Sequence, residues 1–384
     1  MSNLYFDFGH SYLNKAGEEL CGDSLTFNRN SHQIILVLSD GLGSGVKANI
    51  LSTLTTKIIS VMLEKGASIN EVTETLSETL PFCKVRKLAY STFSIAQCFL
   101  NGDTCVTEYD NPPAIFISEG KVQTLSYQIR EIGGRKIKQS HLKLTSGDWL
   151  IFISDGEVHA GIGGVWNLSW SWDRIAAYLE MRSALKLSAQ QLADDLVNVA
   201  YKLYQKKPGD DATVGVLKIR ERRRATLLIG APRNREDDPE VVHNFMNSQG
   251  KKIVCGGTTG NIVARELNRE IDVDMKTATA DIPPVGIIRG IDLVTEGTIT
   301  LMKALELLKD QPRLSDLKYK SDGASRLALE LSTADSIEVI LGRAINPAHQ
   351  NPHLPFNLGL KTKFVEDITA LLKRRDKEVI INHY

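Results

Sequence analysis

Four aspartates stand where apolar, strand-like segments begin or end, and each has a glycine beside it in the sequence. Carboxylate, carbonyl and water oxygens are the ligands that Mg²⁺ and Mn²⁺ prefer. Carboxylates at neighbouring strand ends can converge on such ions, and a glycine lets a backbone carbonyl join them. The four are Asp23 in CGDS, Asp40 in SDGLGSG, Asp155 in SDGE and Asp210 in GDDAT. This pattern predicts a site for hard divalent cations.

Each of these motifs also has a simpler interpretation. An isolated Asp-Gly pair indicates only a turn, because both residues favour turn conformations. Four such aspartates in this order favour a metal site instead. The motifs contain no histidine or cysteine at ligand spacing, which argues against zinc. His349 and His353 in NPAHQNPH have a metal-compatible spacing, but surface histidines of a proline-rich loop are the favoured interpretation.

The framework for these motifs is predicted from apolar stretches of strand length. They are HQIILVL, STFSIAQCFL, CVTEYD, AIFI, DWLIFI and ATVGVL, with alternating or continuous apolar residues. Strands that alternate with a few helices in this way predict a sheet sandwich with helices packed outside it.

Three helices are predicted among these strands. The first opens at Gly45, ends near Gly66 and is expected to turn its apolar face toward the core. The second opens with the capping box Ser68–Glu71 and stops before Pro81, and a later one opens with the box Ser188–Gln191. The apolar face of the first helix comprises Ile50, Leu51, Leu54, Ile58, Val61 and Met62.

The ordered motifs resemble those of the metal-dependent protein phosphatases of the 2C type, and specifically the bacterial SpoIIE-like branch. The residues that carry the resemblance are GD at 22–23, DGLGSG at 40–45, GDWLIFISDG at 147–156 and DDAT at 210–213. STFSIAQCFL followed by YDNPPAIFISEGKV is similar to the central hairpin of that family. The resemblance covers residues 1–219 and implies an α+β fold, a β-sandwich of two antiparallel sheets flanked by helices.

The resemblance also implies a site and a reaction. Asp40 would bridge two Mn²⁺ or Mg²⁺ ions, and the Gly41 carbonyl would bind one of them. Asp155 and Asp210 would hold the other ion, with Asp23 on the opposite side, directly or through water. A metal-bridging hydroxide would then attack the phosphorus of phosphoserine or phosphothreonine in line, without a phosphoenzyme. In bacterial relatives the substrate is a phosphorylated regulatory protein of a partner-switching system.

Some residues depart from the family pattern. Glu157 follows SDG where an apolar residue is usual, and either approaches the water shell of the metal or faces solvent. Lys47 is a candidate for gripping phosphate, since no arginine stands near Asp23, but a surface lysine is favoured. Asn111 in DNPP is interpreted as a turn residue. The two helices between residues 45 and 80 match those that switch in the SpoIIE-like branch, and the sequence does not decide whether they switch here.

Residues 225–384 lie outside this resemblance and are predicted to form a separate α/β domain, because strands and helices alternate. The charged segment 218–225, KIRERRRA, is predicted to be a solvated linker. GGTTGN at 256–261 and the glycine before TITLMKALELL begin helices, and amides at such a helix start could hold a small anionic ligand. Ligand sensing or substrate docking is favoured for this domain over a purely structural or dimerising role.

Composition narrows the class of protein. Lysine plus arginine and aspartate plus glutamate both number 46, so no overall charge favours nucleic acid or an anionic membrane. Five scattered cysteines without a CxxC pair and an N-terminus without a signal peptide predict a reduced, soluble, cytoplasmic protein. A protein serine/threonine phosphatase is therefore predicted. The alternatives are a catalytically weak signalling or binding module and a phosphatase of a small phosphorylated metabolite.

Overall fold

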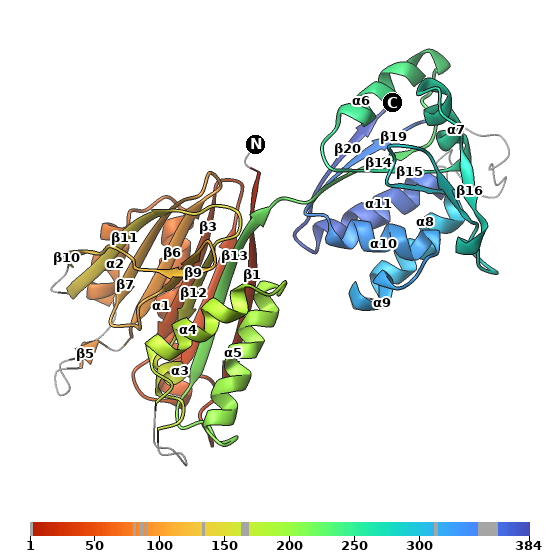
Figure 1. Cartoon of the computed structure of the whole chain (residues 1–384). Coiled ribbons are helices and arrows are strands. Elements are labelled where there is room, and N and C mark those ends of the chain that lie inside the picture. Colours follow the sequence, from red (N-terminus) through yellow and green to blue (C-terminus); the bar gives the residue numbers. More distant parts are fainter. Residues whose placement is uncertain are drawn as a thin grey trace. The chain divides into compact units, whose positions relative to one another are not determined.

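The chain divides into two compact units, Met1–Glu221 and Arg222–Tyr384, which are described separately (Figure 1). The structure is a computed structural model that describes residues 3–79, 82–83, 88–89, 91–132, 135–162, 169–310, 314–344 and 360–384. His349 and His353 lie outside the described residues, as does Pro81.

Two antiparallel sheets form the centre of the N-terminal unit. One has the order β1 (Leu4–Leu13), β13 (Ala212–Glu221), β12 (Trp149–Ile153), β8 (Ile115–Ser118) and β9 (Lys121–Gln123). The other has the order β10 (Gln128–Ile132), β11 (Arg135–Lys143), β7 (Asp103–Tyr109), β6 (Phe93–Phe99), β3 (Gln33–Asp40) and β2 (Asp23–Arg29). A short pair, β4 (Phe82–Cys83) and β5 (Leu88–Ala89), stands apart.

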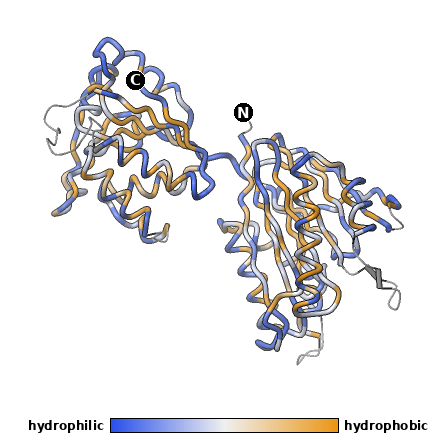
Figure 2. Tube along the Cα trace, turned by 180° about the vertical axis from the view of Figure 1, so that it is seen from behind, coloured by the Kyte–Doolittle hydropathy of each residue, from blue (hydrophilic) through white to orange (hydrophobic). Residues whose placement is uncertain are grey.

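The two sheets pack face to face through apolar residues of β1, β3, β12 and β13. Leu36, Phe152 and Leu217 are among the buried members of this inner cluster. Alternate residues of the same strands point to the outer faces, because successive side chains of a strand lie on opposite sides of the sheet. The expected β-sandwich is therefore confirmed, and hydrophobic residues follow the strands of both units (Figure 2).

Helices cover the outer faces of the sandwich (Figure 1). Helices α1 (Gly45–Glu64) and α2 (Ile69–Thr79) pack on the six-stranded sheet, while α4 (Trp172–Ser183) and α5 (Ala189–Leu203) pack on the five-stranded one. Both predicted capping boxes are present: Ser68 and Glu71 exchange hydrogen bonds before α2, and Ser188 and Gln191 do so before α5. The short helix α3 (Asp155–His159) follows β12 directly.

The face that α1 turns inward differs from the expectation. Ile50, Leu54 and Val61 are 58%, 43% and 39% exposed, whereas Ala48 and Ser52 are buried. Small side chains let the helix backbone approach β2 and β3 closely, so the larger side chains stay outside. Among the described residues, α1 is the one helix long and apolar enough to cross a membrane by length and composition, a test that a core helix also passes.

The predicted linker is shorter than expected. Strand β13 continues to Glu221, which pairs with Leu4 of β1, and β14 begins at Arg224. Lys218 belongs to the strand, and its ammonium lies 4.5 Å from the centre of the Trp149 ring. Residues 218–221 are therefore part of the sandwich, because the alternation of the β13 side chains continues through the charged segment.

The C-terminal unit is an α/β domain, as predicted. Its sheet has the order β16 (Asp272–Asp274), β17 (Val285–Ile287), β18 (Leu293–Thr295), β15 (Lys251–Cys255), β14 (Arg224–Ile229), β19 (Ser336–Leu341) and β20 (Glu378–His383). The last five strands of this order are parallel, and β17 is antiparallel to both of its neighbours.

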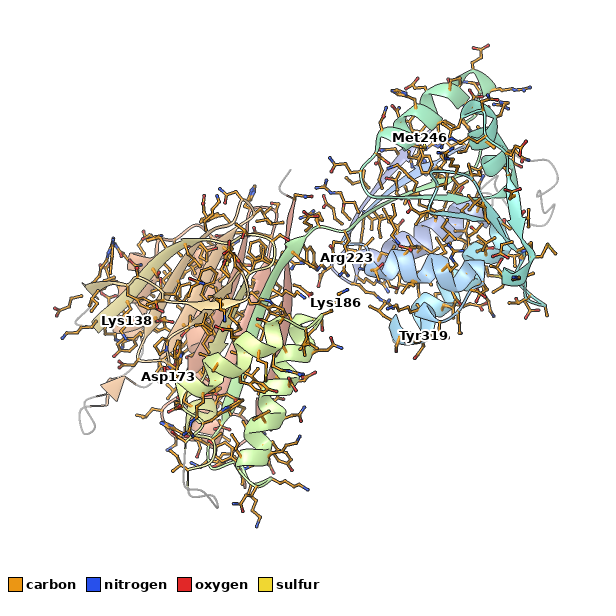
Figure 3. The ribbon with its side chains drawn as sticks, viewed as in Figure 1. Lys138, Asp173, Lys186, Arg223, Met246 and Tyr319 are labelled. Carbon is orange, nitrogen blue, oxygen red and sulfur yellow. The ribbon has the colours of Figure 1, made fainter. Side chains whose placement is uncertain are left out.

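Helices lie on both faces of this sheet. Helices α6 (Asp238–Asn247) and α7 (Gly257–Glu266) pack on one face, and α8 (Thr298–Lys309), α9 (Leu314–Lys318), α10 (Gly323–Thr333) and α11 (Leu360–Lys373) pack on the other. Charged and polar side chains such as Lys138, Asp173 and Tyr319 point outward from the two units (Figure 3). The connections between parallel strands pass through helices, as such strands require.

Candidate metal centre

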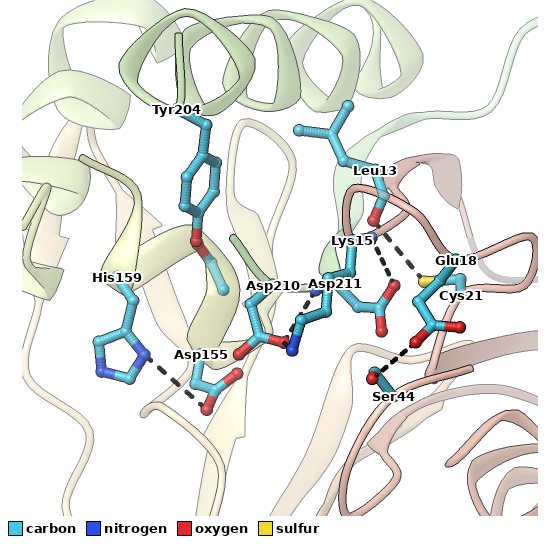
Figure 4. A network of polar contacts seen from close by, with 11 residues as sticks. Leu13, Lys15, Glu18, Cys21, Ser44, Asp155, His159, Tyr204, Asp210 and Asp211 are labelled. Atoms are coloured by element: carbon cyan, nitrogen blue, oxygen red, sulfur yellow. Dashed lines mark hydrogen bonds and ion pairs between the residues drawn. The ribbon is translucent and has the colours of Figure 1, made fainter. Parts of the chain in front are cut away.

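One end of the sandwich collects the four predicted aspartates. Asp23 opens β2 and stands directly opposite Asp40, the last residue of β3, in the antiparallel register. Asp155 follows β12 at the first turn of α3, and Asp210 precedes β13. Strands β12 and β13 are neighbours, so their adjoining ends bring Asp155 and Asp210 beside each other (Figure 4).

Hydrogen bonds hold these strand ends in place. The Ser154 amide donates to the Thr213 carbonyl at 2.9 Å, and the Thr213 amide donates to Ser154 Oγ at 2.8 Å. The Tyr204 hydroxyl of the segment after α5 donates to the Gly156 carbonyl at 2.7 Å. These bonds position α3, and with it Asp155, against the start of β13.

The electrostatics of the site are those of crowded carboxylates. Burial raises the pKa of Asp40, and the negative charges of Asp23, Asp155 and Asp210 raise it further. Burial likewise raises the pKa of Asp23, although hydrogen bonds from Ser154 and Thr213 oppose that shift. The pKa of Asp210 is raised by burial and by the charge of Asp155. The site therefore favours either protonation of its carboxylates or the binding of cations.

Basic side chains of the described residues offset little of this charge. Lys15 Nζ lies 4.0 Å from Asp210 Oδ1, and both side chains are 39% exposed. His159 Nδ1 lies 3.9 Å from Asp155 Oδ2 (Figure 4). Exposed pairs at such distances contribute little, because water screens them. The net charge of the cluster remains negative.

Several carboxylate oxygens at this site are buried without a hydrogen-bond partner, and they indicate whether a divalent cation fits the site. Asp23 Oδ2, Asp211 Oδ2 and both carboxylate oxygens of Glu157 are buried and accept no hydrogen bond. A buried anion without a partner is costly, and a cation relieves that cost. The donor set consists of oxygens, which suits Mg²⁺ and Mn²⁺. These residues fit such ions, although no three described His, Cys, Asp or Glu side chains are already close enough to enclose one.

Glycine is required at position 41 by a close approach of two chain segments. A Cβ on Gly41 would lie 2.1 Å from the carbonyl oxygen of Ala48 in α1. The adjoining Asp40 carbonyl accepts the Thr92 amide at 2.9 Å, and the Ser91 hydroxyl donates to it at 3.1 Å. The chain at Asp40 is thus fixed between β6 and the start of α1, which limits how the Asp40 carboxylate can be presented.

The structure also places the residues that depart from the family pattern. Lys47 is exposed on α1, in agreement with a surface lysine. The Thr92 hydroxyl bonds to the Asn111 side chain, whose Nδ2 donates to Ser94 Oγ at 3.1 Å, so Asn111 anchors the start of β6 as well as a turn. Glu157 is fully buried, and its expected alternative of facing solvent is wrong.

Sequence reasoning left Asp211 out of the site. Its side chain is 4% exposed, its Oδ1 accepts the Lys15 amide at 2.9 Å, and its charge acts on Asp23. The DDAT motif contains both Asp210 and Asp211, but nothing in the motif indicates which of the two is buried. Burial comes from the packing of β13 against α3.

Comparison with known proteins identifies the class of this domain. Residues 30–220 match the family described as stage II sporulation protein E (SpoIIE). The solved PP2C phosphatase domain of SpoIIE from Bacillus subtilis, with a fragment of its regulatory domain, is 21% identical, with a TM-score of 0.50, covering 58% of this chain and 65% of that one. The N-terminal domain therefore has the PP2C-type phosphatase fold. Residues 30–220 thus carry a domain that matches the SpoIIE family.

Two further proteins are similar to this chain. The curated stage II sporulation protein E of Bacillus subtilis (strain 168) is 26% identical over 216 residues, which are 55% of this chain and 25% of the relative. This chain thus spans about a quarter of the length of that relative. The phosphatase domain of SpoIIE from Bacillus subtilis, solved alone, is 20% identical with a TM-score of 0.46, covering 58% of this chain and 95% of that one.

Proposed function

We propose that the N-terminal domain is a Mn²⁺- or Mg²⁺-dependent phosphatase of phosphoserine and phosphothreonine in a regulatory protein. The observation that carries the proposal is the set of buried, unpartnered carboxylate oxygens at the end of a PP2C-type sandwich. When bound, two divalent ions would lower the pKa of water and neutralise phosphate charge. The substrate class follows the family, and a partner-switching regulator in the cytoplasm is the proposed setting.

The residues of the chain have distinct roles in this proposal. Asp40 would contribute its carboxylate to both ions, and the Gly41 carbonyl would help to hold one of them. Asp155 and Asp210, at the adjoining ends of β12 and β13, would hold one ion, and Asp23 would act from the opposite side. The rigid strand ends keep the carboxylates in place, so that little reorganisation is needed when the phosphate enters.

Hydrolysis of defined substrates by the full-length protein tests this function. With Mn²⁺ present, we expect turnover of p-nitrophenyl phosphate and a higher kcat/KM for phosphoserine and phosphothreonine peptides. A sugar phosphate that outcompetes the peptides would instead support a metabolite phosphatase. No turnover of any of the three, in protein that binds Mn²⁺, would support the catalytically weak module.

We propose that the C-terminal domain regulates the phosphatase or selects its substrate, through a small anionic ligand at the carboxyl edge of its parallel strands. Ligands of open α/β sheets bind at this edge, where the direction of strand order reverses. Here β14 lies between β15 and β19. The ammonium of Lys361 lies close to Gly230, which follows β14: a Cβ on Gly230 would be 2.3 Å from Lys361 Nζ. Helix α7 begins at Gly257, directly after β15, which adds N-terminal amides at the same edge.

Removal of the C-terminal domain tests this division of labour. A chain ending at Glu221 retains all of β13, whereas one ending at Arg220 loses the last pair with β1. We expect the chain of residues 1–221 to hydrolyse p-nitrophenyl phosphate with a kcat/KM within about twofold of the full-length value, since independent sites perturb each other by less than about 0.5 kcal/mol. Turnover of the phosphoprotein substrate should change more. A folded, Mn²⁺-binding 1–221 chain without aryl phosphatase activity would contradict the proposal.

A further inference from the structure

The carboxylate of Glu157 is buried in the N-terminal domain without a hydrogen-bond partner. Glu157 is 0% exposed, and neither Oε1 nor Oε2 accepts a hydrogen bond. It lies in the first turn of α3, two residues after Asp155, and its amide donates to the Ser154 carbonyl at 3.2 Å. An apolar side chain would fill such a position at lower cost, because a buried carboxylate must give up its hydration.

Glu157 lies near one carboxylate of the candidate metal centre, that of Asp23. The charge of Asp23 acts directly on Glu157, and Asp23 itself has an unpartnered buried oxygen. Helix α3 is pressed against the start of β13, since a Cβ on Gly156 would lie 2.0 Å from the Asp211 carbonyl oxygen. Glu157 is thus buried within electrostatic reach of Asp23, and no described cationic side chain is among the groups that act on its charge.

Another buried glutamate of the same domain shows the contrast. Glu108 is 2% exposed, and its Oε1 accepts the Ala114 amide at 2.6 Å, whereas its Oε2 has no partner. This hydrogen bond fixes the turn after β7, which gives the Glu108 carboxylate a structural role. Glu157 makes no such bond, so protein structure alone does not account for its carboxylate.

We propose that Glu157 is a further ligand of the metal centre and contributes its charge to the ion on the Asp23 side, directly or through one of the waters that such ions retain. This inference rests on the metal centre of the proposed function. The additional carboxylate makes the site more negative than Asp23, Asp40, Asp155 and Asp210 alone. It therefore raises the affinity for a divalent cation, which compensates the buried charge.

Calorimetric titration of the full-length protein with Mn²⁺ tests this role without relying on activity. We compare the wild type with Glu157→Gln, which keeps the shape, and Glu157→Leu, which fills the space with an apolar side chain. Both variants should bind Mn²⁺ about 10- to 100-fold more weakly, the range for loss of a supporting metal contact. Glu108→Gln is the matched control, a buried glutamate outside the cluster, and should keep the wild-type Kd.

A second measurement separates this role from a structural one. In EDTA, Glu157→Leu should unfold at a higher temperature than the wild type, because the uncompensated buried carboxylate is gone. With saturating Mn²⁺, the increase in Tm caused by the metal should be smaller in both Glu157 variants. An unchanged Mn²⁺ Kd in folded Glu157→Gln would overturn the inference and leave the proposed phosphatase intact. A wild-type protein that binds no Mn²⁺ would overturn both.

Discussion

Asp40→Asn should reduce kcat for p-nitrophenyl phosphate by roughly 10²- to 10⁴-fold at saturating Mn²⁺, a loss of several kcal/mol of transition-state stabilisation. Asp40 ends β3 opposite Asp23, and the charges of Asp155 and Asp210 also act on it. In the proposed function, Asp40 would contribute its charge to both ions. An asparagine has a similar shape but lacks the negative charge that bridging requires.

The same substitution should stabilise the metal-free fold, although it lowers activity. The charges of the other carboxylates repel an ionised Asp40, so the metal-free Asp40→Asn protein should unfold at a higher temperature than the metal-free wild type. Asp173→Asn, which changes an exposed aspartate of α4, is the control for both measurements. Retention of the wild-type kcat by folded Asp40→Asn would show that Asp40 does not bridge the ions.

Removal of metal should abolish hydrolysis. Treatment with EDTA, followed by gel filtration, should bring turnover of p-nitrophenyl phosphate to the background rate, and added Mn²⁺ or Mg²⁺ should restore it. The same addition should stabilise the fold by about 2.7 kcal/mol when the ion is present at 100 times its Kd. Full activity in protein shown by elemental analysis to be metal-free would exclude the proposed mechanism.

The effect of pH on the metal-free protein follows from the raised pKa values of Asp23 and Asp40. Below the unfolded value of 3.8, these groups are protonated in both states and contribute no pH dependence. Between that value and the raised folded values, the unfolded chain has lost protons that the folded chain still holds, so stability falls as pH rises. Bound Mn²⁺ should remove this fall, because the ions favour the ionised carboxylates. Thermal unfolding at several pH values, with EDTA or Mn²⁺, measures the difference.

Much of the fold was predictable because it depends on local patterns. The apolar stretches became β3, β6, β7, β8, β12 and β13, since alternating or continuous apolar residues suit a half-buried or buried strand. The capping boxes before α2 and α5 formed because their partners are only three residues apart. Alternation of strands and helices in the C-terminal half predicted its α/β class for the same reason.

The site was predictable only as a set of motifs. Its aspartates were recognised from their places at strand ends, and their roles as ligands remain predictions. The burial of Asp211 and Glu157 was not predictable, because it depends on α3 packing against β13, a contact between segments far apart in sequence. A motif shows which residues are acidic, whereas solvent exposure is a property of the packed chain.

The sequence by itself determined the types of the main elements, the order of the acidic motifs and the two classes of domain. Only the tertiary structure decided which face of α1 lies against the sheet, because that helix is apolar around much of its circumference and small Ala48 and Ser52 permit the closest approach. It also decided that β1 pairs with β13, two strands at opposite ends of the domain's sequence. The same pairing makes the charged segment through Glu221 part of a strand. Local periodicity cannot choose among such alternatives, since each depends on the surface that a distant segment supplies.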